Sequence, residues 1–103
     1  MVGIDILALE EFKKQLETGG DPFLRRVYAE HELENREPVH LAGIFCAKEA
    51  VLKAVGIEPG GWPRIAIKYQ ANGKPFAEVD GRIIPVSISH HGQYAVAVAM
   101  DLP

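Results

Sequence analysis

The hydrophobic pattern of this chain changes its period once, near residue 60, and this change limits the possible folds more than any other feature. From residue 9 to residue 55 the apolar residues recur at helical spacing, whereas from residue 64 to residue 100 they alternate, as in half-buried strands. The pairs Asn72-Gly73 and Asp80-Gly81 interrupt the alternating region and are typical of hairpin turns. Because helices come first and an antiparallel sheet follows, the sequence predicts an α+β fold.

Before the helices, residues 2–7 alternate and are expected to form a strand whose more apolar face carries Val2, Ile4 and Ile6. A helix is expected from Leu9 until Gly19-Gly20 stops it. Asp21-Pro22 should begin another helix, with Asp as the N-cap and Pro at the first helical position.

The strongest predicted helix spans residues 40–55 and ends at Gly56, and Pro38 is expected to break the partly helical stretch before it. Its apolar arc is too broad for a surface helix, so we expect burial on most sides. The small residues Ala42, Cys46 and Ala50 should allow a backbone or a ligand to approach closely.

The alternating half is expected to form an antiparallel sheet. Its predicted strands are residues 64–70, 76–79, 83–89 and 94–100. Tyr69 is expected to face inward in the first of them. In the last strand Ala95, Ala97 and Ala99 share one face, which would let a helix pack closely.

Composition places limits on the class of protein. A chain of 103 residues predicts one domain, residues 1–103, and the net charge of −3 argues against a nucleic-acid-binding protein. No apolar run reaches the roughly 20 residues needed to span a bilayer, and no export signal is evident, so no membrane association is expected. Cys46 is the only cysteine, which excludes an internal disulfide and favours a cytoplasmic location. An acidic partner would need a local basic patch, for which Lys13-Lys14 and Arg25-Arg26 are candidates, although solvated surface charge is the favoured interpretation of each pair.

Asp5, Glu49 and Lys53 are the candidate catalytic residues. Asp5 is a carboxylate inside an apolar strand, and Glu49 and Lys53 are one turn apart on the apolar helix. Two carboxylates brought together by folding could hold one hard cation. Each residue also has a plainer interpretation: Glu49 could pair with Lys53 on the helix surface, and a backbone N–H or a lysine could satisfy Asp5.

Four ordered motifs resemble those of the 4′-phosphopantetheinyl transferase superfamily, specifically its short holo-acyl-carrier-protein synthase group. The motifs are Gly3 to Ile6 (G-x-D-I), Phe45 to Ala54 (F-x-A-K-E-A-x-x-K-A), Gly73 to Pro75 (G-x-P), and Ser87 to His90 (S-I-S-H) followed by Tyr94 to Ala97 (Y-A-x-A). Each motif is short, but their order across nearly the whole chain is specific. The resemblance implies the superfamily's fold, with an N-terminal strand and helices packed on an antiparallel sheet.

The resemblance also implies an activity: Mg²⁺-dependent transfer of the phosphopantetheine arm of coenzyme A to a serine of an apo acyl or peptidyl carrier protein, with release of adenosine 3′,5′-bisphosphate. The carrier could belong to fatty-acid or polyketide assembly. By motif, Asp5 and Glu49 would ligate Mg²⁺ and Lys53 would contact the coenzyme phosphates. The residues expected beside the coenzyme are Gly56, Pro75, Ser89 and His90. The implied assembly is a homotrimer with coenzyme A between neighbouring subunits. The general base stays open, with Glu49, acting through a metal-bound water, as one candidate.

The sequence departs from the family pattern at Ile44, at Glu11, at His91, where a threonine is common, and at Asp80-Gly81-Arg82, which replaces a segment that is often helical. Ile44 stands where an arginine commonly helps to bind the coenzyme's 3′-phosphate, so we expect weaker coenzyme binding and a gain from Ile44→Arg. Glu11 stands where an arginine often grips the acidic carrier, which predicts a less acidic carrier or another docking patch. These departures leave room for a catalytically weak member that acts as a carrier-protein or coenzyme-binding module. A purely structural domain is the third hypothesis, and it would leave the four ordered motifs as a coincidence.

Overall fold

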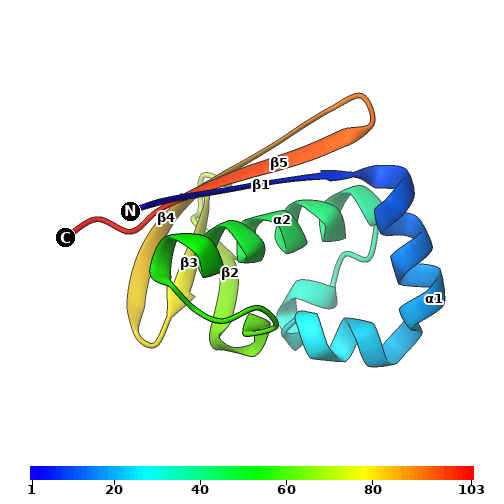
Figure 1. Ribbon diagram of the computed structural model, residues 1–103, viewed down its shortest axis with the longest axis horizontal. Helices are drawn as coiled ribbons and strands as arrows, with labels where there is room; N and C mark the ends of the chain where they lie inside the picture. The colour runs from blue at the N-terminus through cyan, green and yellow to red at the C-terminus, as the bar shows by residue number, and fades with distance from the viewer.

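A computed structural model describes residues 1–103 and contains two helices packed on one five-stranded antiparallel sheet, as the sequence predicts (Figure 1). The strand order is β1-β5-β4-β3-β2. The elements in chain order are β1 (Val2–Ala8), α1 (Leu9–Val27), the 3₁₀ turn η1 (Glu30–Leu33), α2 (Pro38–Val55), the 3₁₀ turn η2 (Trp62–Arg64), β2 (Ile65–Tyr69), β3 (Pro75–Val79), β4 (Arg82–His91) and β5 (Tyr94–Met100). No helix is both long enough and apolar enough to cross a membrane.

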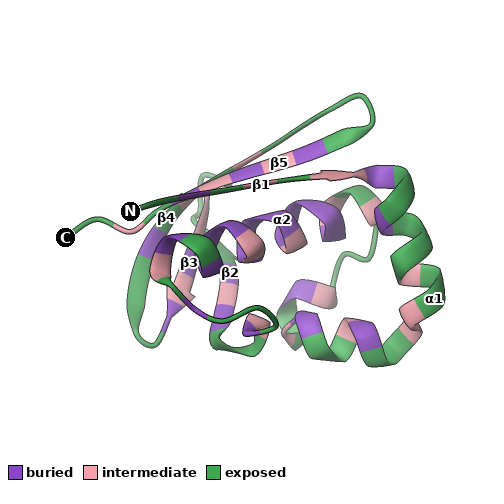
Figure 2. Cartoon of the chain, in the orientation of Figure 1, coloured by how far each residue is buried: buried purple, intermediate pink, exposed green.

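The central helix α2 lies along the inner face of the sheet, between the sheet and α1 (Figure 1). The close approach that we predicted from small residues is confirmed: Ala42, Cys46 and Ala50 are fully buried, and a Cβ built on Gly3 of β1 would lie 1.9 Å from the carbonyl oxygen of Ala50. A side chain at position 3 would therefore push β1 off the helix. The predicted row of alanines on β5 faces α2 and is buried as well (Figure 2).

The opposite face of the sheet is bare in the single chain. Val2, Ile4 and Ile6 of β1 are 59%, 58% and 64% exposed, and Tyr94 and Met100 of β5 are exposed beside them. The apolar face of β1 therefore points away from α2, and the face toward α2 carries Gly3 and Asp5 instead. This arrangement places the carboxylate of Asp5 against the helix.

Helix α1 contains the interruption that the sequence predicts. Gly20 has φ 56° and ψ −150°, so the helix bends there, and Asp21-Pro22 resumes it. The stretch before Pro38 ends as predicted, but α2 begins at Pro38, two residues earlier than expected. A proline is tolerated at that position because its missing N–H would have no partner inside the helix.

The tight Asp80–Gly81 turn joins β3 directly to β4, and both residues have positive φ values, 49° and 82°. The prediction for Tyr69 was wrong: its side chain is 46% exposed at the end of β2. Tyr69 shares the face of the buried Ile65 and Ile67 and stacks on His40 of α2, but it is not enclosed as they are.

A buried ion pair fastens α2 to η1. The Lys48 ammonium is 2.6 Å from the Glu32 carboxylate and donates to the Val27 carbonyl at 2.7 Å, and both side chains are at most 1% exposed. Glu32 also accepts the backbone N–H groups of Ala29 and Ile67, each at 2.7 Å. Burial lowers the pKa of Lys48 while the Glu32 carboxylate opposes that shift. Every charge in this network has partners, so it holds the structure together and leaves no group for a ligand.

Candidate active site

Asp5 and Lys53 meet across the interface between β1 and α2. Lys53 Nζ lies 3.2 Å from Asp5 Oδ1 and donates to the Ile4 carbonyl at 2.8 Å. The Glu49–Lys53 pair that helix spacing allows does not form, because Lys53 reaches across to the strand. The plainer interpretation of Asp5, that a lysine satisfies its carboxylate, agrees with this contact. The Asp5 side chain is 18% exposed and that of Lys53 is 56% exposed, so both remain open to a ligand.

Cys46 lies buried beneath Asp5. Its thiol lies 3.5 Å from Asp5 Oδ2. Burial raises the pKa of Cys46 to about 12, and the charges of Asp5 and Glu49 add to the shift while Lys53 opposes it. The thiol therefore stays protonated and unreactive near neutral pH.

Glu49 has one hydrogen-bond partner in the protein. The indole Nε1 of Trp62, in η2, donates to Glu49 Oε2 at 2.9 Å, and Glu49 Oε1 has no hydrogen-bond partner. Trp62 is not among the residues that the sequence motifs predict for the site. The available signal was the position of the single tryptophan, which comes directly after Gly60-Gly61, where the hydrophobic pattern changes its period.

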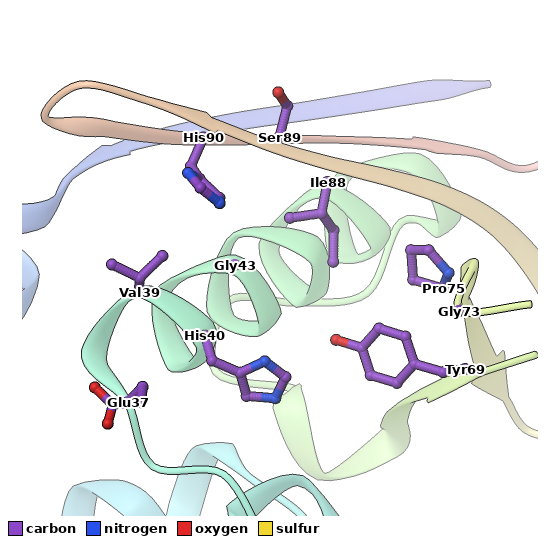
Figure 3. A pocket seen from close by; sticks show the side chains of 10 residues that line it. All are labelled: Glu37, Val39, His40, Gly43, Tyr69, Gly73, Pro75, Ile88, Ser89 and His90. Atoms are coloured by element: carbon purple, nitrogen blue, oxygen red, sulfur yellow. The ribbon is translucent and has the colours of Figure 1, made fainter.

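A separate pocket of about 440 Å³ lies beside the first turns of α2, between that helix, β4 and the β2–β3 hairpin (Figure 3). Three of the predicted coenzyme contacts line it: Pro75, Ser89 and His90. The structure adds His40 and Tyr69, whose rings stack with centroids 6.2 Å apart. Neither residue was predicted for the site, because the sequence pattern indicates only a helix start at His40 and a core position at Tyr69.

Ser89 and His90 point in opposite directions, as neighbouring residues of a strand must. In Figure 3 the His90 ring points into the pocket, while the Ser89 hydroxyl points away from it. Ser89 pairs in register with Val96, on the bare face of the sheet. The two predicted contacts are therefore divided between the pocket and the outer face.

The pocket contains none of Asp5, Glu49, Lys53 or Gly56. Gly56 follows α2 in the left-handed conformation (φ 85°), and its N–H bonds to the Leu52 carbonyl. A Cβ there would meet no atom within 4 Å, so its surroundings are open. The predicted site residues thus form two groups: Asp5, Glu49 and Lys53 at the β1–α2 interface, and Pro75 and His90 at the pocket between β3 and β4, with Ser89 turned to the outer face of β4.

The carboxylate cluster fits a Mg²⁺ ion shared with a ligand better than a preformed metal cage. No group of three or more His, Cys, Asp or Glu side chains is placed to hold a metal. Mg²⁺ is usually bound by one or two carboxylates together with substrate phosphates and water. Asp5 and Glu49 supply two carboxylates, and Glu49 Oε1 is unpaired.

The comparisons with known proteins identify the family. The family model described as the 4′-phosphopantetheinyl transferase superfamily matches residues 1–99. The chain belongs to this superfamily. Two similar relatives are holo-[acyl-carrier-protein] synthases, one of Thermodesulfovibrio yellowstonii (39% identical, covering 93% of this chain and 92% of the relative) and one of Protochlamydia amoebophila (35% identical, covering 96% and 94%).

Solved structures of 4′-phosphopantetheinyl transferases agree with this fold. The Helicobacter pylori holo-[acyl-carrier-protein] synthase in complex with coenzyme A superposes with a TM-score of 0.88 at 26% identity, covering 97% of this chain and 98% of that one. The Bacillus anthracis synthase gives a TM-score of 0.81 at 32% identity, covering 95% and 91%. The predicted family, its short synthase group, the α+β fold and the enzyme class are therefore confirmed.

The burial of Ile44 removes the basis for expecting a gain from Ile44→Arg, whereas weaker coenzyme binding stays a prediction. The Ile44 side chain is 1% exposed and lies in the core, so this position does not face a ligand in the chain. An arginine there would bury a guanidinium, which costs several kcal/mol without a partner. Ile44→Arg is therefore expected to destabilise the fold, and it is no test of coenzyme affinity.

Proposed function

We propose that this transferase moves the 4′-phosphopantetheine arm of coenzyme A to a serine of an apo acyl or peptidyl carrier protein, requires Mg²⁺, and releases adenosine 3′,5′-bisphosphate. The observation that carries the proposal is the cluster at the β1–α2 interface. Asp5 comes from one motif and Glu49 and Lys53 from another, and folding brings Lys53 into contact with Asp5 while Glu49 lies one turn away on α2. The coenzyme A complex of the Helicobacter pylori relative supports the choice of donor.

The cluster can supply what phosphoryl transfer needs, namely charge neutralisation and alignment. The serine oxygen of the carrier attacks the phosphorus that bears the pantetheine arm, and the bond from that phosphorus to the nucleotide phosphate breaks. Mg²⁺, held by Asp5 and Glu49, would neutralise the diphosphate charge. Lys53 offers a mobile ammonium to the same phosphates once a ligand competes with Asp5 for it. The serine proton leaves to a general base, for which Glu49 is one candidate.

The separation of the two residue groups supports a coenzyme site between subunits. Asp5 is on the edge strand β1, whereas His90 is on β4, two strands away in the sheet, and the pocket that it lines extends to the β2–β3 hairpin. The bare face of β1 and β5 carries exposed Ile4, Ile6 and Tyr94, which a neighbouring copy could cover. We propose a homotrimer in which the pocket of one chain and the cluster of the next bind one coenzyme.

The carrier is proposed to dock on α1. Lys14 and Arg26 line a hollow of about 520 Å³ at the bend of that helix. Arg26 also lies 6.0 Å from the centre of the Trp62 ring, whose N–H holds Glu49. Basic groups beside the carboxylate cluster would bring an acidic carrier close to it. A cytoplasmic location belongs to this proposal and rests on the single cysteine, Cys46.

Mass spectrometry of candidate apo-carriers tests the function. The protein is incubated with coenzyme A and each carrier, with Mg²⁺ or with excess EDTA. We expect the carrier to gain the mass of one phosphopantetheine arm with Mg²⁺ only. Transfer at full rate in EDTA would remove the metal from the proposal. Coenzyme binding without transfer to any carrier would favour a binding module.

Complementation between inactive variants tests the shared site. Glu49→Gln and His90→Ala chains are purified separately, then dissociated, mixed and reassembled. If one chain supplies Glu49 and its neighbour supplies His90, mixed assemblies contain some intact sites and recover part of the activity. No recovery in assemblies shown to be mixed would place both residues in one chain's site.

A further inference from the structure

Trp62 is the only tryptophan of the chain, and its single polar atom is aimed at Glu49. The Nε1–Oε2 distance is 2.9 Å, and the two residues are thirteen positions apart, in η2 and α2. The contact is therefore made by the tertiary fold and not by helix spacing. None of the four family motifs includes Trp62.

The Trp62 ring is held in place by its neighbours. Its centroid lies 5.8 Å from that of Phe45, one turn before Glu49, and the Arg26 guanidinium lies 6.0 Å from the ring centre. Phe45 in turn contacts the rings of Phe12 and Phe23, which are buried. The indole has little freedom to turn its N–H away from Glu49.

Glu49 needs such a partner because the last torsion of a glutamate is broad and would let the carboxylate rotate. No other group in the protein bonds to this carboxylate. The donor is also neutral. Lys53 brings a full positive charge to Asp5, whereas the indole orients Glu49 and leaves its negative charge available to a cation.

We propose that Trp62 is a positioning residue, whose N–H holds the Glu49 carboxylate in the orientation that accepts a divalent cation. This rests on the proposed function, in which Glu49 is a metal ligand. Groups that hydrogen-bond to metal ligands orient them, and losing such a group typically weakens metal affinity or activity by about 10–100-fold.

The test uses Trp62→Phe, which keeps an aromatic ring against Phe45 and removes the N–H. Free Mn²⁺ is measured by electron paramagnetic resonance during titration of the whole protein with coenzyme A present. We expect the Mn²⁺ affinity of Trp62→Phe to fall by about tenfold, at the lower end of the range for such partners. Coenzyme affinity in excess EDTA and the unfolding midpoint should stay close to those of the unchanged protein.

A double-mutant cycle with Glu49→Gln separates positioning from packing. If Trp62 acts through Glu49, Trp62→Phe has no further effect on Mn²⁺ affinity in the Glu49→Gln background. An equal loss in both backgrounds, or an unchanged Mn²⁺ affinity in Trp62→Phe alone, overturns the proposal. If Glu49→Gln itself binds Mn²⁺ as well as the unchanged protein does, the metal role of Glu49 fails, and the proposed mechanism fails with it.

The unchanged protein gives an independent readout if Trp62→Phe does not fold. Mn²⁺ is paramagnetic and should quench the emission of the single tryptophan when it binds with coenzyme A. The quenching should be absent in Glu49→Gln. Tryptophan emission that is unaffected by bound Mn²⁺ in the unchanged protein would overturn the proposal.

Discussion

Lys48 and Glu49 are neighbours in the chain, yet they lie in opposite environments on α2. Lys48 is 1% exposed, and its ammonium contacts both Glu32 and the Val27 carbonyl. Glu49 is half-buried, with one oxygen bonded to Trp62 and the other unpaired. Successive residues of a helix point about 100° apart, so one step along α2 moves from the core to the site.

The two environments differ in whether every charged group has a partner within the protein. A fully paired group stabilises the fold, whereas a partly unpaired group can bind a ligand. The Lys48–Glu32 network has no unpaired polar atom, so removing one member leaves an uncompensated buried charge. The Asp5–Glu49–Lys53 cluster is partly open to solvent and keeps an unpaired oxygen. The cluster therefore leaves carboxylate and ammonium groups available to a ligand.

The largest effect on stability is expected from breaking the Lys48–Glu32 network. Glu32→Gln would leave the Lys48 ammonium buried without a counter-charge and should lower the free energy of unfolding by about 3–5 kcal/mol. Urea unfolding at a fixed chain concentration measures it. The matched control is Glu78→Gln, which breaks the exposed Lys68–Glu78 pair and should cost less than about 1 kcal/mol. Equal losses for the two variants would contradict the structural role of the network.

The next largest effect is expected on the rate of phosphopantetheine transfer. Asp5→Asn keeps the shape of the side chain and removes its charge, so transfer should fall by at least about 100-fold, since even the partners of metal ligands typically matter by 10–100-fold. Its stability should change little, because Lys53 is largely exposed. Asp101→Asn is the control, as Asp101 pairs with Arg82 and has a similar exposure of 21%. Near-normal turnover in Asp5→Asn would show that Asp5 is not a ligand.

The smallest effect is expected at the carrier surface. Glu11 is exposed on α1, where the family pattern has an arginine, and Glu11→Arg should speed modification of an acidic carrier by up to about fivefold, the range of surface ion pairs. The gain should shrink as salt rises, because exposed charges are screened. Rates at subsaturating carrier across a salt series measure it. Glu17→Arg, on another side of α1, changes the net charge equally, and an equal gain there would place Glu11 outside the docking surface.

The sequence predicted the fold well because its signals are local. The period change, the Gly20 interruption and the Asn72-Gly73 and Asp80-Gly81 turns all depend on neighbouring residues, and all appear in the structure. The site was harder to predict. Family motifs gave Asp5 and Glu49, but the partner of Lys53, the Trp62 contact and the burial of Ile44 depend on which side of α2 meets β1, η1 and η2. Those are tertiary facts that spacing along the chain does not contain.

Lys48→Met and Glu49→Gln, measured side by side, test the central comparison most directly. For each variant the transfer rate per folded molecule and the free energy of unfolding are determined under the same conditions. We predict that Lys48→Met loses about 3–5 kcal/mol of stability and keeps its transfer rate. Glu49→Gln should lose most of its transfer and no more than about 1 kcal/mol of stability, the size of one hydrogen bond. The reverse pattern, or the same losses in both variants, would contradict the division of α2 into a structural side and a chemical side.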